Sequence, residues 1–201
     1  MKQRILVWDL PTRLFHWLLA ASFIGAFLTA ESERWRDTHV LLGYTVVGLI
    51  AFRVIWGFIG TRYARFSTFA FTPSKTFAYV RSLLTAQPQH YVGHNPAGSW
   101  VIYALLVLGL FAGASGYATY NEVGGEWFEE LHEGLANSML ALVFVHVAGV
   151  LVSSLLHREN LVRSMIDGYK QGDASHGIRR THWLIGAGLL GGVIAWWSGI
   201  I

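Results

Sequence analysis

The chain of 201 residues is 53% hydrophobic and only 13% charged, and its formal net charge is +3. Soluble domains carry roughly 25% charged residues, so the composition excludes an ordinary soluble domain and indicates a membrane protein. The absence of cysteine excludes disulfides, zinc–thiolate sites, iron–sulfur clusters and covalently attached c-type haem. The modest net charge gives no indication of nucleic-acid binding.

Apolar segments follow one another along the chain, at about 14–30, 40–60, 100–120, 135–156 and 183–201. A membrane-spanning helix needs roughly 20 such residues, within a range of about 17–25. The sequence therefore predicts an all-α protein with five transmembrane helices. The polar stretch 61–99 is predicted to be a loop with one short surface helix near Lys75–Thr85.

Basic residues gather in the segment before the first helix and in the segments after the second and fourth. These twelve residues are Lys2, Arg4, Arg13, Arg62, Arg65, Lys75, Arg81, Arg158, Arg163, Lys170, Arg179 and Arg180. The opposite loops contain only Arg34 and Arg36, with five glutamates between residues 122 and 133. Because cytoplasmic loops carry the excess of Lys and Arg, we expect a cytoplasmic N-terminus and an external C-terminus.

Four histidines fall at matched depths in the predicted helices. His16 lies near the inner end of the first helix and His39 near the outer end of the second. The fourth helix carries His132 and, 14 residues later, His146. This spacing corresponds to about 21 Å along the axis and a difference in direction of only about 40°. The pattern predicts two pairs, His16 with His146 and His39 with His132.

Two imidazoles at one depth suit an iron macrocycle, and haem b binds between helices without any cysteine. Zinc fits less well, because it prefers four ligands in one tetrahedron. His39 and His132, taken singly, could be solvated interfacial residues, but an ionisable residue within a span, such as His146, indicates function. His157 is a rival ligand, which we interpret as interfacial because Arg158 follows it at the end of the apolar run.

An arginine within the second helix, Arg53, follows His39 by 14 residues and therefore shares its face. It could bind a propionate of the inner haem, or it could extend to the cytoplasmic interface. Arg13 is a weaker candidate for the same propionate. No pattern indicates a nucleophile or a hydrolytic centre, so we predict no catalytic residue.

Several blocks of sequence resemble the bacterial cytochrome b561 family, which is related to the b-type cytochrome subunits of nickel–iron hydrogenases. They are VWDLPTRLFHW, HVLLGYTVVGLIAFRVIWGF, VGHNPAGS and HVAGVLVSSLLHRENLVRSMIDGYK. The resemblance implies a transmembrane four-helix bundle over residues 1–170 that binds two b haems. The family's ligand positions match His16, His39, His132 and His146. Residues 171–201 would form a cytoplasmic linker and the fifth helix.

The resemblance implies electron transfer across a bacterial inner membrane between the quinone pool and a redox partner, such as a c-type cytochrome or a dehydrogenase or hydrogenase subunit. Three alternatives stay open. The chain could be the membrane anchor and electron-transfer subunit of a hydrogenase or another periplasmic oxidoreductase, or a superoxide:quinone oxidoreductase. It could also be a haem-free transporter. Whether the chain is itself an enzyme is left open, and membrane lipid is expected around it.

Overall fold

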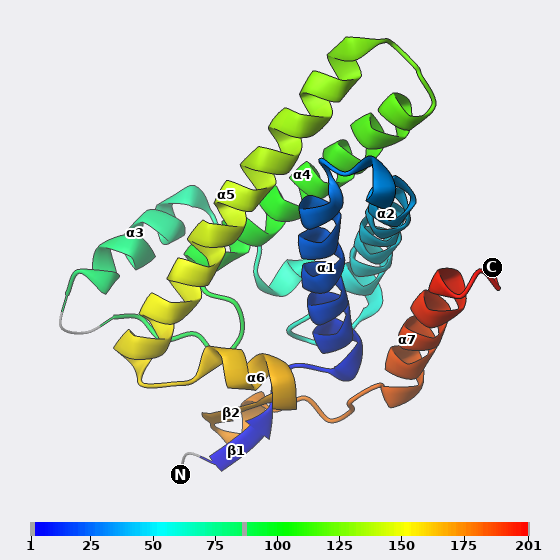
Figure 1. Cartoon of the computed structure of the whole chain (residues 1–201). Coiled ribbons are helices and arrows are strands. Elements are labelled where there is room, and N and C mark those ends of the chain that lie inside the picture. Colours follow the sequence, from blue (N-terminus) through cyan, green and yellow to red (C-terminus); the bar gives the residue numbers. More distant parts are fainter. Residues whose placement is uncertain (1–2, 86–87, 201) are drawn as a thin grey trace.

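The computed structural model describes residues 3–85 and 88–200. Its framework consists of the helices α1 (Leu10–Thr29), α2 (Arg36–Ile59), α4 (Pro96–Tyr120) and α5 (Glu126–His157) (Figure 1). Each is long and apolar enough to cross a membrane. Four of the five predicted spans are therefore confirmed as helices of sufficient length.

The long helices pack as two hairpins. Helix α1 packs on α2 and α4 packs on α5, and contacts between α2 and α4 join the hairpins. Glycines make this junction close, because a Cβ on Gly109 would lie 2.6 Å from Cδ1 of Ile50 and one on Gly113 would lie 2.2 Å from Cγ2 of Val47. Small residues allow membrane helices to approach in this way.

Buried polar caps fix where two of these helices begin. The Asp9 carboxylate accepts a hydrogen bond from the Thr12 N–H at 2.8 Å, which caps α1. It also accepts bonds from Nε1 of Trp56 and Oγ1 of Thr61, so it ties the start of α1 to the end of α2. Helix α4 is capped by Asn95, which accepts a bond from the Gly98 N–H at 2.7 Å.

The last apolar segment forms α7 (Trp183–Trp197), which is shorter than the predicted range 183–201. Its 15 residues extend about 22 Å, which is less than the roughly 30 Å of a hydrocarbon core. It packs along α1, and its Val193 shares a hydrophobic cluster with Phe15 of α1 and Leu49 of α2. At its end, Nε1 of Trp197 donates to Oγ1 of Thr45 at 3.0 Å.

Short elements cover one end of the helices. Strand β1 (Gln3–Leu6) pairs antiparallel with β2 (Tyr169–Gly172), and α6 (Leu161–Asp167) lies beside them (Figure 1). The sequence did not predict this ladder. The surface helix expected near Lys75–Thr85 is α3 (Pro73–Leu83), preceded by the 3₁₀ turn η2 (Phe66–Thr68).

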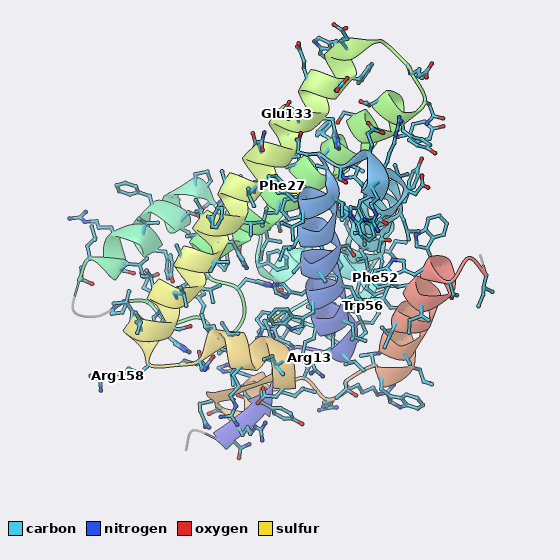
Figure 2. All side chains as sticks on the ribbon, viewed as in Figure 1. Arg13, Phe27, Phe52, Trp56, Glu133 and Arg158 are labelled. Atoms are coloured by element: carbon cyan, nitrogen blue, oxygen red, sulfur yellow. The ribbon has the colours of Figure 1, made fainter. Side chains whose placement is uncertain are left out.

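The basic segments meet at this same end. Nζ of Lys170 donates to the Val92 carbonyl at 3.0 Å, and the Tyr63 hydroxyl donates to the carbonyl of His176, which lies in η3 (Ala174–His176). The opposite end consists of η1 (Glu33–Trp35) and the turn between α4 and α5. Figure 2 shows Glu133 and Arg158 toward opposite ends of α5, as the charge pattern requires. The proposed domain boundary at residue 170 falls within β2 and stays a prediction.

Candidate functional site

The first predicted histidine pair is brought together by helices from different hairpins. The ring centroids of His16 on α1 and His146 on α5 are 6.3 Å apart, with 50° between the ring planes. Among the described residues, α1 and α5 are not one of the closely packed helix pairs. The two rings therefore approach each other although their helices make few other contacts.

The second predicted pair has the same arrangement at the other end of α5. The ring centroids of His39 on α2 and His132 on α5 are 6.0 Å apart, with the planes at 86°. Nδ1 of His39 lies 2.9 Å from the Ala26 carbonyl, and Nδ1 of His132 lies 2.8 Å from the Ala112 carbonyl. A ring that donates through Nδ1 keeps Nε2 free as a metal ligand.

Both separations fit a pair of imidazoles that would hold one iron between them. An imidazole nitrogen binds such a metal at about 2.0 Å, and the ring centroid lies about one ångström beyond that nitrogen, so the two centroids would be roughly 6 Å apart. Within residues 3–85 and 88–200, no group of three or more His, Asp or Glu side chains could hold a metal ion. The paired residues fit haem and do not fit a tetrahedral zinc site.

Neighbouring residues shape the space around these rings. A Cβ on Gly116 would lie 2.9 Å from Cε1 of His132, so glycine at this position in α4 leaves room for the ring. Trp17 packs edge-on against His16, with the ring centroids 5.0 Å apart. Nδ1 of His16 is buried and has no hydrogen-bond partner.

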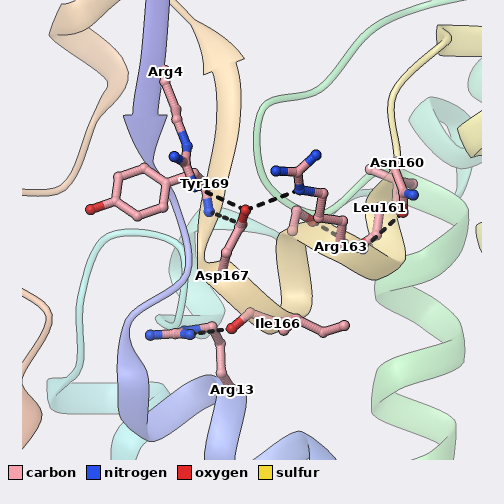
Figure 3. Close-up of polar contacts among 9 residues, drawn as sticks. Arg4, Arg13, Asn160, Leu161, Arg163, Ile166, Asp167 and Tyr169 are labelled. Atoms are coloured by element: carbon pink, nitrogen blue, oxygen red, sulfur yellow. Dashed lines mark hydrogen bonds and ion pairs between the residues drawn. The ribbon is translucent and has the colours of Figure 1, made fainter.

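The two predicted arginines differ in their surroundings. Arg53 is only 3% exposed, so its side chain does not extend to the interface, which was one of the two predicted roles. Its guanidinium lies over Phe66, 4.8 Å from the ring centroid, and Nη1 is buried without a partner. Arg13 instead donates from Nη1 to the Ile166 carbonyl on α6 (Figure 3).

The rival ligand His157 lies away from both pairs. Its ring packs edge-on against His90, with the centroids 5.2 Å apart, and Glu159 lies beside them. Lys170 extends into the same region, where its Nζ is 3.0 Å from Oε2 of Glu159 and its side chain is 3% exposed. These residues form a polar cluster at the basic end of the molecule.

Sequence reasoning missed one further histidine, His94, between α3 and α4. Its ring packs against Trp8 and Phe69, with centroid distances of 4.7 and 4.3 Å. Burial, and then the charges of Arg53 and Lys170, lower the pKa of His94 to about 3. The polar segment around His94 gives no direct sign that the ring is buried. The one available hint was its position directly before Asn95, which caps α4 and so fixes the backbone there.

Comparison with known proteins agrees with this geometry. The profile of prokaryotic cytochrome b561 matches residues 7–168. A probable Ni/Fe-hydrogenase B-type cytochrome subunit of Azotobacter vinelandii is 27% identical, over 83% of this chain and 88% of its own length. Corresponding subunits of Rhizobium leguminosarum bv. viciae and Escherichia coli (strain K12) are 25% and 21% identical, over 83% and 82% of this chain and 89% of their own lengths.

No solved structure matches the chain. The profile match covers most of the sequence and includes all four long helices. The chain is thus a multi-pass membrane protein and a b-type cytochrome for electron transfer, and it belongs to the prokaryotic cytochrome b561 family.

Proposed function

We propose that the protein holds two b haems, the inner one between His16 and His146 and the outer one between His39 and His132. The observation that carries this proposal is the occurrence of two facing imidazole pairs, with centroid separations of 6.3 and 6.0 Å. The haems, when bound, supply one-electron oxidation and reduction. Held by these histidines, the haems would serve electron transfer and not oxygen binding.

The protein's own residues hold the sites at two depths. His132 and His146 are about 21 Å apart along α5, so one pair lies toward each face of the membrane. The carbonyls of Ala26 and Ala112 orient the outer rings. The buried guanidinium of Arg53 is available to a propionate of the inner haem, and Arg13, already bonded to α6, has a lesser part. This arrangement conducts electrons across the bilayer.

The proposed setting is a bacterial inner membrane, with the basic end in the cytoplasm and the C-terminus in the periplasm. Grouping of the basic segments at one end supports this orientation. This orientation requires α7 to cross the membrane, although the helix has only 15 residues. A short span is accommodated by local thinning of the bilayer.

Quinone is the proposed electron carrier within the membrane, with a redox partner at its surface. The names of the relatives favour a hydrogenase, so the chain would act as its membrane anchor and pass its electrons to quinone. Purification under mild conditions tests this role. A hydrogenase subunit that stays bound supports it, whereas a chain that is always recovered alone and accepts no electrons from hydrogenase contradicts it.

A pyridine haemochrome assay of the purified protein tests the haem proposal. We expect haem b at about two per chain and two steps in a redox titration. A colourless protein from cells with ample haem would contradict the proposal and favour a transporter instead.

A further inference from the structure

Besides Nδ1 of His16 and Nε of Arg13, two further buried nitrogens on this side of the molecule have no partner. They are Nη1 of Arg53 and Nδ1 of His94. Buried polar atoms are nearly always hydrogen-bonded, so each orphan needs an explanation. The two side chains share one aromatic wall, because Phe69 lies 5.8 Å from the guanidinium carbon of Arg53 and 4.3 Å from the His94 ring, measured to ring centroids.

His94 lies within electrostatic range of the inner histidine pair. Besides Arg53 and Lys170, the groups that act on its charge are His146 and His16. No ion pair joins Arg53 to an acidic group within the described residues. The Asp9 carboxylate also acts on Arg53, but it makes no ion pair with it and already accepts bonds from Thr12, Trp56 and Thr61. The Arg53 guanidinium and the His94 ring thus stand near the inner pair without an ion-pair partner among the described residues.

The segment that carries His94 is held firmly in place. Lys170, itself bonded to Glu159, donates to the Val92 carbonyl two residues earlier. A Cβ on Gly93 would lie 2.5 Å from Cδ1 of Tyr63, so the backbone lies directly against that ring. Asn95 caps α4 immediately afterwards. The imidazole is therefore presented from a fixed backbone, which is how cofactor contacts are made precise.

We infer that His94 binds a propionate carboxylate of the inner haem through Nδ1, next to Arg53. This inference rests on the proposed function, because it takes the inner haem as present. A neutral imidazole donates one hydrogen bond from Nδ1, and a carboxylate accepts it. Arg53 supplies the positive charge, and charge-assisted bonds of this kind are the strong ones. The two orphaned nitrogens are then both satisfied.

Two substitutions of His94 separate hydrogen bonding from packing. His94→Phe keeps an aromatic ring against Trp8 and Phe69 but removes the donor. His94→Asn restores a donor at the δ position. His90→Phe is the matched control, because His90 lies at the same end but contacts Glu159 and His157. All three variants are made in the full chain and purified with haem bound.

The first measurement is the rate at which haem passes from the protein to excess apomyoglobin. We expect the inner haem of the His94→Phe variant to leave about tenfold faster, since a hydrogen bond to a charged acceptor is lost. His94→Asn should recover most of the retention, and His90→Phe should match the wild type. Equal rates in all four proteins would overturn the inference.

The second measurement identifies the group that His94 contacts. Infrared difference spectra between oxidised and reduced protein are recorded with haem labelled by ¹³C at the propionate carboxyls. Label-sensitive bands should shift in the His94→Phe variant and stay in place in the His90→Phe variant. Unchanged label-sensitive bands would reject the propionate contact. Failure of the proposed function is recognised separately, because the wild type would then be purified without haem or His16→Ala would retain the full haem content.

Discussion

His132 and His146 stand on the same helix but face different partners, His39 on α2 and His16 on α1. Helix α5 thus contributes one ring to each site, and the other ring comes from a different helix each time. This division predicts that the two sites can be emptied one at a time.

Replacing one ring should therefore remove one haem. We expect His146→Ala or His16→Ala to lower the haem content from two to about one per chain by pyridine haemochrome. His132→Ala should remove the other haem. His157→Ala is the control, because that ring packs on His90 and should leave both haems bound. Full haem content in the His146→Ala or His16→Ala protein would show that the pairing is wrong.

Adding bulk at Gly116 should disturb the outer site alone. In Gly116→Val, the new Cβ would lie within 3 Å of the His132 ring and displace it. We expect the outer haem to be depleted while the inner haem keeps its absorption spectrum. Gly48→Val is the comparison, since a Cβ on Gly48 meets nothing within 4 Å. Equal haem contents in these two variants would contradict the role assigned to Gly116.

Removing the buried cation Arg53 should change the potential of one haem. In Arg53→Leu, loss of a nearby positive charge favours the oxidised state, so we expect the inner midpoint potential to fall. A tenfold change in a one-electron equilibrium corresponds to about 59 mV, and we expect a shift of that order. Arg13→Leu should shift it less, because Arg13 bonds to α6. An unchanged titration of both haems in Arg53→Leu would rule out the propionate role.

Acid should weaken the contact between β1 and α6. Oδ2 of Asp167 accepts a bond from Arg4 at 3.0 Å and lies 3.4 Å from Nε of Arg163, as Figure 3 shows. Burial acts to raise the pKa of Asp167, but the Tyr169 N–H and the two guanidinium groups outweigh it and lower that pKa below 3.8. The carboxylate therefore stabilises the fold above pH 3.8, and this contribution is lost as the pH falls through the lowered pKa.

Thermal unfolding in detergent checks this expectation. At pH 7, Asp167→Asn should cost about 0.5–1 kcal/mol, because the guanidinium partners are solvent-exposed. The wild type and the variant should converge as the pH falls below the lowered pKa of Asp167. Asp37→Asn, at the opposite end of the molecule, should have little effect at either pH. A difference between wild type and Asp167→Asn that persists unchanged at the lowest pH the protein survives would contradict the ionic contribution.

The long helices and the histidine pairs could be predicted because each follows from a regular period. An apolar run of about 20 residues specifies a span, and a spacing of 14 residues returns to nearly the same helix face. The structure places each ring beside its predicted neighbour, because depth in a membrane can be counted from the ends of a span. Their role as haem ligands stays a prediction. In contrast, α5 begins at Glu126, well before the apolar run, because hydropathy does not detect a polar first turn.

Features that depend on contacts far apart in sequence escaped prediction. Strands β1 and β2 have four residues each, and they are separated by most of the chain, so no local pattern pairs them. Burial of His94 depends on Trp8 and Phe69, which come from two other segments. Only the folded arrangement shows that its polar loop is lined by aromatic rings.

Because α5 supplies a ring to both sites, neither can be completed until this helix has left the ribosome and entered the bilayer. A nascent chain ending after α2 would already contain His16 and His39, yet each would lack its opposing ligand. Under the proposed function, each haem would therefore be inserted only after α5 is in place.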